Sequence, residues 1–311
     1  MSEVVLKNIT KTYGKGSIKA VTDVSLAVEK GEIFGLIGPD GAGKTTIFRM
    51  LTTLLKPDAG EAFVNELDVV KDYKKIRTRV GYMPGRFSLY QDLTVEENLN
   101  FFATVFNTTI KENYHLVKDI YGHIEPFKNR KAGALSGGMK QKLALSCALI
   151  HKPTVLFLDE PTTGVDPVSR KEFWEMLKNL KTQGITILVS TPYMDEATLC
   201  DRIALITEGK ILKIDTPENI VADFEKILWS VKGKNMHKLL SDLRENNKLA
   251  SCFAFGDTHH VTLADEKYDV SELEVFLKQK GHSAIEIQLA KPNIEDCFMA
   301  LGTENSKNAT R

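Results

Sequence analysis

The sequence has no excess of either charge and no long apolar run. Its 41 lysines and arginines balance its 41 aspartates and glutamates, whereas a nucleic-acid binder usually carries a basic excess or a basic stripe. No stretch approaches the roughly eighteen apolar residues that a membrane-spanning helix needs. The first residues, MSEVVLKNIT, also lack the basic and then apolar run of a signal peptide. We therefore expect a cytoplasmic protein that does not bind nucleic acid, and any membrane crossing would come from other chains.

Cysteine is scarce, and its spacing does not indicate a metal site. The four cysteines are far apart and have no metal-ligand spacing: Cys147, Cys200, Cys252 and Cys297. This pattern indicates buried or incidental thiols in a reducing compartment.

Short apolar strands alternate with helical stretches along the first two thirds of the chain. This alternation predicts an α/β domain with a largely parallel sheet. Thr94 and Glu97 have the spacing of a capping box, which predicts a helix start. The expected strands are 4–9, 20–28, 33–38, 154–158, 185–190 and 202–207, and the expected helices are 43–55, 94–106, 112–124, 137–150, 167–181 and 193–199. The stretch 85–150 lacks strands and indicates a helical insertion.

A second, smaller α+β unit follows, with strands near 227–231, 252–255 and 285–289. Its helices are expected near 236–245, 271–280 and 293–301. We therefore predict one domain over 1–222, a second over 223–302 and a disordered tail over 303–311, because the tail sequence TENSKNATR is polar.

A glycine-rich loop with phosphate-binding chemistry stands between an expected strand and an expected helix. It fits the pattern G-x-x-x-x-G-K-S/T, in which backbone N–H groups and the helix N-terminus cradle phosphate oxygens. Lys44 should reach the β- and γ-phosphates of a nucleotide, and Thr45 should ligate Mg²⁺. The loop comprises Gly38, Pro39, Asp40, Gly41, Ala42, Gly43, Lys44, Thr45 and Thr46.

Two adjacent carboxylates, Asp159 and Glu160, end an apolar strand. The carboxyl edge of such a sheet is where α/β proteins place ligands. Asp159 is suited to hold Mg²⁺ through water, and Glu160 is suited to accept a proton from an attacking water. Alone, this pair would equally fit acidic residues that cap the next helix.

The segment LSGGMKQK, from Leu135 to Lys142, distinguishes among the families that share a phosphate loop and an acidic pair. Its serine and two glycines at a helix start form a second anion site, and it resembles the signature sequence of ABC ATPases. The resemblance spans roughly residues 3–220 and implies a P-loop NTPase core with an antiparallel β subdomain and a helical subdomain. It further implies an ATPase that binds ATP and Mg²⁺ between two head-to-tail subunits. Ser136, Gly137 and Gly138 would then contact the nucleotide held by the partner.

Other landmarks follow in the family's order. Tyr13 matches the aromatic residue that stacks on adenine, although a tyrosine that only packs locally at a strand edge would give the same sequence pattern. Asp166 matches the loop that crosses the dimer interface, and with Pro167 it also fits a helix N-cap and first-turn proline. The C-terminal segment KPNIEDCFMAL resembles the closing helix of the extra domain in drug-exporter ATPases.

The sequence departs from the family at two positions. Gly85 stands where a glutamine is usual, and Pro192 stands where the family has a histidine that contacts the γ-phosphate. Because proline has no side-chain donor, we expect slow hydrolysis at this chain's own site. This favours pairing with a second, more typical ABC ATPase over a homodimer.

The leading hypothesis is the ATP-binding and hydrolysing subunit of an exporter, held at the inner face of the membrane by a separate permease. Two alternatives stay open: a regulatory subunit with little hydrolysis of its own, and a soluble ABC ATPase unrelated to transport. Three minor features are interpreted structurally. We expect His259 and His260 to be a surface pair at a strand end, the basic cluster at 71–79 to be a solvated helix face, and Trp174 to pack in the core.

Overall fold

The computed structural model describes residues 2–264 and 269–309. The chain forms two compact units that divide after Pro217, within helix α7 (Pro217–Ala222). The expected boundary lay at residue 222, so the division falls a few residues earlier. Within the described residues, no helix is both long enough and apolar enough to cross a membrane.

The centre of the first unit is a six-stranded sheet in the order β10-β9-β3-β8-β7-β6. Neighbouring strands from β9 to β6 run parallel, and β10 is an antiparallel edge. Every residue of β3, β7 and β8 is buried, as expected for parallel strands covered on both faces. The strands are β3 (Ile33–Ile37), β6 (Val80–Met83), β7 (Val155–Asp159), β8 (Thr186–Thr191), β9 (Arg202–Thr207) and β10 (Lys210–Asp215).

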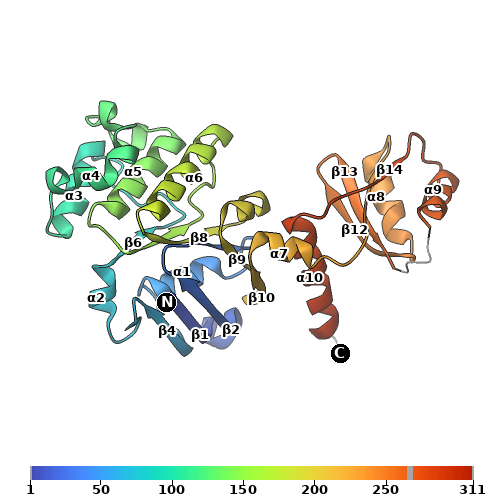
Figure 1. Ribbon diagram of the computed structural model, residues 1–311, viewed down its shortest axis with the longest axis horizontal. Helices are drawn as coiled ribbons and strands as arrows, with labels where there is room; N and C mark the ends of the chain where they lie inside the picture. Colours follow the sequence, from blue (N-terminus) through green and yellow to red (C-terminus); the bar gives the residue numbers. More distant parts are fainter. Residues whose placement is uncertain (1, 265–268, 310–311) are drawn as a thin grey trace. The chain divides into compact units, whose positions relative to one another are not determined.

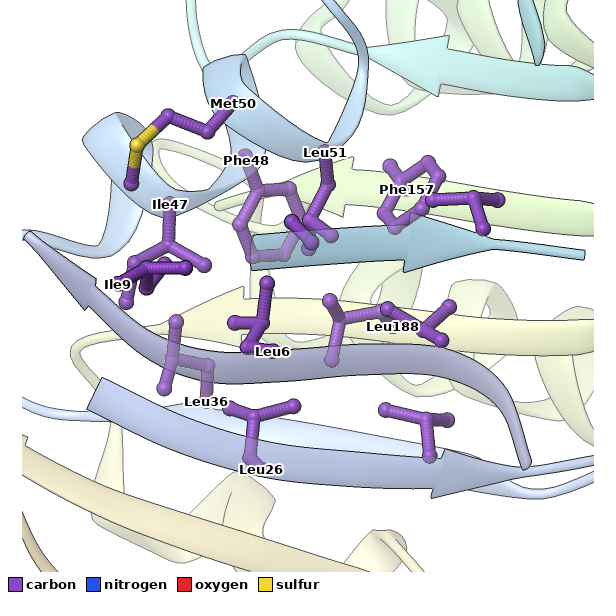
Figure 2. Close-up of a cluster of buried hydrophobic side chains, with 14 of the residues drawn as sticks. Leu6, Ile9, Leu26, Leu36, Ile47, Phe48, Met50, Leu51, Phe157 and Leu188 are labelled. Carbon is purple, nitrogen blue, oxygen red and sulfur yellow. The ribbon is translucent and has the colours of Figure 1, made fainter. Parts of the chain in front are cut away.

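A second, antiparallel sheet has the order β2-β1-β4-β5. Its strands are β1 (Ser2–Tyr13), β2 (Ile18–Glu29), β4 (Ala59–Val64) and β5 (Leu67–Asp68). Helix α1 (Lys44–Leu51) shares a core with both sheets, and Figure 2 shows Ile47, Phe48 and Leu51 gathered with side chains of β1 and of the central strands. The rings of Phe48 and Phe157 meet edge to face, with centroids 6.1 Å apart. This packing fixes α1 against β7. It therefore positions Lys44, where α1 begins, relative to Asp159, where β7 ends.

The expected helical insertion is confirmed as a cluster of helices beside α6 (Figure 1). It contains α3 (Val95–Val105), α4 (Ile110–Tyr121) and α5 (Gly137–Leu149), and α6 is Pro167–Thr182. Thr94 and Glu97 form the predicted capping box. The 3-10 helices η1 (Gly14–Gly16), η2 (Glu125–Phe127) and η3 (Ala132–Ala134) and the short helix α2 (Tyr73–Arg77) lie in the connections. Trp174 and Leu177 of α6 are buried, as expected.

Several local expectations for the first unit were wrong. Residues 194–199 form a 3-10 helix, η4 (Met194–Leu199), where a helix over 193–199 was expected. Strands β4, β5 and β6 were missed. The basic residues of α2 are exposed as expected, with Lys75 paired to Asp72 at 3.0 Å.

The second unit contains a four-stranded antiparallel sheet in the order β12-β13-β11-β14. Its chain order, strand-helix-strand-strand-helix-strand, is that of the split βαβ motif. The elements are β11 (Leu228–Lys232), α8 (Met236–Glu245), β12 (Leu249–Phe255), β13 (Thr258–Leu263), α9 (Val270–Gln279), β14 (Glu286–Leu289) and α10 (Ile294–Ala309). The helices pack through Leu239, Leu243, Leu273 and Leu277 on Val231 and Val261. The predicted α+β class is therefore confirmed.

Two expectations for this unit were wrong. His259 and His260 are not at the surface, because they lie in β13 with 5% and 8% of their areas exposed. His260 Nδ1 is 2.7 Å from Asp296 Oδ1, and His259 Nε2 is 2.8 Å from the Met236 carbonyl oxygen. The tail expected to be disordered over 303–311 is helical from 303 to 309, because it continues α10, and residues 310–311 lie outside the described residues.

Candidate functional site

The loop from Gly38 to Gly43 connects β3 to α1 and is held tightly against its neighbours. A Cβ atom at Gly38 would lie 2.1 Å from the carbonyl oxygen of Ile206, and one at Gly43 would lie 2.4 Å from that of Ala20. Gly43 also has φ of 101°, which only glycine adopts without strain. The sequence therefore needs glycine at both positions, and the N–H groups at the start of α1 open onto the loop.

Lys44 is the first residue of α1 and is 3% exposed. Its ammonium group donates hydrogen bonds to the carbonyl oxygens of Gly38 at 2.8 Å and Pro39 at 3.0 Å. It also lies 3.1 Å from Glu160 Oε1. Lys44 is thus a buried cation whose charge is aimed into the loop, at the place where the sequence predicts phosphate.

The two carboxylates at the end of β7 have different surroundings. Asp159 is 2% exposed and accepts a hydrogen bond of 2.6 Å from Ser190 Oγ. Glu160 has φ of 51°, a left-handed conformation that costs a non-glycine residue on the order of 1 kcal/mol. Its N–H donates to both the carbonyl oxygen and Oγ of Ser190, at 3.1 and 3.0 Å. This turn directs the Glu160 carboxylate toward Lys44.

The strand order places four segments at one edge of the sheet, because β3, β8, β7 and β6 are parallel neighbours. Gly38 N–H donates to the Thr191 carbonyl oxygen at 3.3 Å, which joins the phosphate loop to the end of β8. Pro192 follows directly. Gly85, beyond the end of β6, is also at this edge, since a Cβ atom there would lie 3.0 Å from the Asp159 carbonyl oxygen. Gly85 therefore lies beside the backbone of Asp159, and Pro192 follows the strand end that bonds to the phosphate loop.

Tyr13 comes from the other sheet, at the end of β1. Its hydroxyl is 3.4 Å from Thr46 Oγ1, and 36% of the residue is exposed. The tyrosine is therefore placed beside the phosphate loop with part of its surface open to solvent.

Ser136, Gly137 and Gly138 form a separate cluster. Ser136 caps α5, where its hydroxyl accepts a hydrogen bond from Met139 N–H at 3.4 Å. A Cβ atom at Gly138 would lie 2.6 Å from Ser169 Oγ, so α5 begins against the first turn of α6. Gly137 is exposed. Helices α1 and α5 lie apart in Figure 1, so the two glycine-rich segments are in different parts of the first unit.

Asp166 belongs to this second cluster, because its loop leads into α6. Its carboxylate accepts a hydrogen bond from Ser169 N–H at 3.0 Å, and Pro167 follows at the first helical position. This bond lowers the pKa of Asp166. The interpretation as a helix cap is confirmed, while an interface role is compatible with its exposure.

Sequence reasoning missed Ser190, which bonds both to Asp159 and to the backbone of Glu160. The available signal was a pair of hydroxyl residues, Ser190 and Thr191, at the end of an apolar strand that points to the same sheet edge. The resulting donor set fits a magnesium nucleotide: a glycine cradle, a buried lysine, a threonine hydroxyl and an acidic pair.

Comparisons with known proteins agree with this geometry. The family model described as ABC transporter matches residues 21–163. The doxorubicin resistance ATP-binding protein DrrA of Mycobacterium tuberculosis (strain CDC 1551 / Oshkosh) is 31% identical over 99% of this chain and 96% of its own length. The chain belongs to the family of ABC transporter ATP-binding proteins. The chain has, as predicted, an ABC ATPase fold.

Two other ATP-binding proteins of ABC transporters are similar to this chain. A Nod factor export ATP-binding protein I of Burkholderia orbicola (strain AU 1054) is 34% identical, and the match covers 97% of each chain. The probable multidrug ABC transporter ATP-binding protein YbhF of Escherichia coli (strain K12) is 43% identical over 219 residues. That match covers 70% of this chain but only 37% of YbhF.

Solved structures show the same fold. The dimeric cassette MJ0796, described as a post-hydrolysis state bound to ADP and Pi, has a TM-score of 0.63 and 29% identity. It covers 68% of this chain and 98% of its own. The cassette cbiO1 from Clostridium perfringens has a TM-score of 0.64 and 26% identity, and covers 72% of this chain and 92% of its own.

Proposed function

We propose that this chain is the ATP-binding and hydrolysing subunit of an ABC exporter and energises a separate membrane permease. The observation that carries the proposal is the division of the site. The phosphate loop with its acidic pair forms one cluster, and Ser136 with its two glycines forms another elsewhere in the unit. Each cluster is half of a nucleotide site, so two cassettes arranged head to tail would complete two sites.

The geometry of the first cluster supports the chemistry that we assign to it. The Lys44 ammonium exchanges the carbonyl oxygens of Gly38 and Pro39 for β- and γ-phosphate oxygens. Thr45, and Asp159 through water, would hold Mg²⁺, which would neutralise phosphate charge when the nucleotide is bound. Glu160, next to Lys44, takes the proton of the attacking water. Tyr13 stacks on the adenine ring, for which its position beside Thr46 is suitable.

The second cluster serves the opposite nucleotide. The exposed Ser136 and Gly137 offer a hydroxyl and a helix N-terminus to the γ-phosphate held by the other cassette. Asp166, in the loop that packs beside them, reaches across the interface. The dimeric relative bound to ADP and Pi supports a two-cassette assembly.

An apolar groove offers a surface for the permease. It has a volume of about 460 Å³ and lies among β6, α3 and α5. Its lining includes Val80, Met83, Leu89, Phe102 and Phe106. The segment after β6 leads from this groove to Gly85 beside Asp159, so a permease helix seated there would be linked to the nucleotide site. The cassette would then be peripheral on the cytoplasmic face of the membrane. Doxorubicin resistance and Nod factor export, named for two relatives, support export as the direction.

The second cassette is a different chain in this proposal. Gly85 provides no side-chain amide and Pro192 provides no donor, although both lie at the site edge. Losing one preorganised donor to developing charge costs about 3 kcal/mol, and two losses in one site need not add. The site on this chain's phosphate loop therefore binds ATP and turns it over slowly, while Ser136 completes a faster site on the partner.

Pro192 also favours the runner-up, a regulatory subunit that closes on ATP but leaves hydrolysis to its partner. A soluble ABC ATPase without a permease is the remaining alternative. Co-purification of a membrane permease with the tagged chain separates the exporter from the soluble protein.

ATPase turnover tests the proposal. The purified chain should bind ATP but hydrolyse it slowly, and adding the partner ATPase should raise turnover well above the sum of the separate rates. Full-speed hydrolysis by the lone chain would refute the slow-site idea. Failure to bind ATP would refute the proposed function. If Glu160→Gln leaves the turnover of the complex unchanged and the wild-type chain's own site shows no single-turnover hydrolysis, the regulatory role is favoured.

A further inference from the structure

A carboxylate that no proposed step uses is buried beside the site. Glu196, in η4 after β8, is 1% exposed. Its Oε1 accepts a hydrogen bond of 2.8 Å from Thr162 Oγ1, and its Oε2 accepts one of 2.6 Å from Thr191 Oγ1. Burying a carboxylate is costly unless its oxygens are paired, and these two hydroxyls offset part of that cost for Glu196.

The two threonines belong to different loops of the site. Thr162 is two residues after the proposed base Glu160, on the loop that leads to Asp166. Thr191 is the residue before Pro192, and its hydroxyl also accepts a hydrogen bond from Tyr193 N–H at 3.1 Å. The Thr191 carbonyl oxygen accepts from Gly38 N–H at 3.3 Å. One carboxylate therefore joins the Glu160–Asp166 loop to the Pro192 segment and, through Thr191, to the phosphate loop.

Arg170 supplies the opposing charge. Its Nε is 3.7 Å from Glu196 Oε1, and its guanidinium lies over the Tyr193 ring at 4.4 Å from the centroid. Arg170 is on the first turns of α6, and its N–H donates to the Asp166 carbonyl oxygen at 2.9 Å. Among the described residues, Arg170 Nε is buried without a hydrogen-bond partner. The ion pair is therefore held by charge and packing, and it connects the Asp166 end of the loop to the same carboxylate.

We propose that Glu196 is a positioning residue that makes the Glu160–Asp166 loop and the Pro192 segment move as one unit. Residue 192 is a proline and cannot bond to the γ-phosphate, so the connection between its segment and the site runs through Thr191 and Glu196. This inference rests on the proposed ATPase function. Under this inference the positions of Glu160 and Asp166 depend on the buried Glu196 carboxylate, which contacts neither nucleotide nor metal.

The alternative is that Glu196 only stabilises the fold. The two roles differ in one measurable property, because a positioning role requires the disturbance of one loop to be felt in the other. Thr162→Val removes a donor from one side of Glu196, and Thr191→Val removes the donor from the other side. Thr163→Val is the matched control, since it makes the same change one residue away at an exposed position.

The deciding experiment is amide hydrogen exchange on the full chain. Thr162→Val should speed exchange over residues 193–200 by roughly five-fold or more, because it leaves a buried acceptor unpaired. Thr191→Val should do the same over 162–166. Exchange over 44–51 in α1 should change less than two-fold. Thr162→Ser, which keeps the hydroxyl, should restore the wild-type rates, and Thr163→Val should leave them unchanged.

Two results would overturn the inference. One is exchange that rises only in the mutated loop. The other is exchange that rises uniformly through the first unit with no rescue by Thr162→Ser, which is the outcome of a purely structural role.

A kinetic measurement supports the same distinction. In the complex, Glu196→Gln should lower single-turnover hydrolysis at this chain's own site about ten-fold, while the KM for ATP and nucleotide binding to the chain change less than two-fold. A proportional loss of binding sites and activity would contradict positioning. If the wild-type chain binds no ATP, the proposed function fails, whereas unchanged single-turnover hydrolysis with normal binding rejects only the role of Glu196.

Discussion

Lys44 Nζ and Glu160 Oε1 lie 3.1 Å apart, although one begins the helix after β3 and the other follows β7. The pair joins the group assigned to hold phosphate with the group assigned to accept a proton. A bound triphosphate would compete with Glu160 for the Lys44 ammonium. Phosphate binding and the release of the Glu160 carboxylate for base chemistry are therefore coupled in this arrangement.

The first prediction concerns Glu160→Gln. The amide keeps the shape of the side chain but cannot accept the proton, so single-turnover hydrolysis at this chain's own site should fall by about 100-fold or more. ATP affinity should be retained, because Lys44 and the loop are unchanged. Fluorescent-nucleotide titration and phosphate release measure the two effects. Glu175→Gln, on the exposed side of α6, is the control and should change neither quantity. Loss of ATP affinity in Glu160→Gln would show that the pair serves binding and not catalysis.

The second prediction restores the usual histidine. Pro192→His supplies a side-chain donor at the edge where Thr191 bonds to Gly38, and it should raise single-turnover hydrolysis at this site by on the order of ten-fold or more. Gly85→Gln should add less, because its Cβ atom would lie 3.0 Å from the Asp159 carbonyl oxygen, a contact tighter than most Cβ atoms make. Pro192→Ala is the matched control, since it removes the ring without adding a donor. An equal rise in Pro192→Ala would attribute the effect to backbone freedom.

The third prediction separates a glycine needed for folding from one needed at an interface. Gly38→Ala would place Cβ 2.1 Å from a backbone oxygen of Ile206, so it should lower the free energy of unfolding of the first unit by about 3 kcal/mol or more. Gly137→Ala meets only ordinary contact, at 3.4 Å from the Gly164 carbonyl oxygen. This variant should have the same free energy of unfolding as wild type, but its ATP-dependent association should be impaired. Denaturant unfolding and light scattering give the two readings. A stable, fully ATP-binding Gly38→Ala protein would contradict the account of the loop.

The fourth prediction concerns pH. Burial lowers the pKa of His151 below its ordinary value of 6.5, although its ring bonds to the Val80 carbonyl oxygen. Its imidazole stacks on Phe106 with centroids 3.8 Å apart. Below about pH 6.5 the unfolded chain takes up this proton more readily than the folded one. Stability should therefore decrease as the pH falls through 6.5 toward the lowered pKa of the folded protein.

The variant His151→Gln isolates this contribution. Its loss of unfolding free energy between pH 7.5 and pH 5.5 should be smaller than that of wild type, although it should be less stable at pH 7.5. Urea titrations at both values measure this. An equal loss in both proteins would assign the pH dependence to other groups.

The local parts of the site could be predicted from sequence because each depends on residues close in the chain. The spacing of Gly38, Gly43 and Lys44 specifies the phosphate loop, and an apolar strand before Asp159 places that residue at a sheet edge. The Lys44–Glu160 pair and the Glu196 bonds could not be predicted, since they depend on which strands become neighbours. Strand order is a long-range property, and the local periodicity of the sequence does not predict it.

The errors have similar causes. The sequence predicted that His259 and His260 lie at a surface strand end, but both are buried in the second unit. There one ring nitrogen of His260 pairs with Asp296 on α10, and one of His259 pairs with the Met236 carbonyl oxygen. Residues 303–309 read as disordered from composition, but they continue the helix that begins at Ile294. Asp166 shows the reverse case, in which a local rule for helix caps identified its hydrogen bond correctly.

The measurement that tests the central claim most directly is photolabelling with an ATP analogue that carries its reactive group on the γ-phosphate. The chain would carry Lys44→Ala, so that its own loop no longer holds the phosphates, and would be mixed with a competent second cassette. The account predicts label at residues 136–138 of the Lys44→Ala chain, only when the second cassette is present. Label at Ser136 in the isolated wild-type monomer, or no label there in an ATP-bound complex, would contradict it.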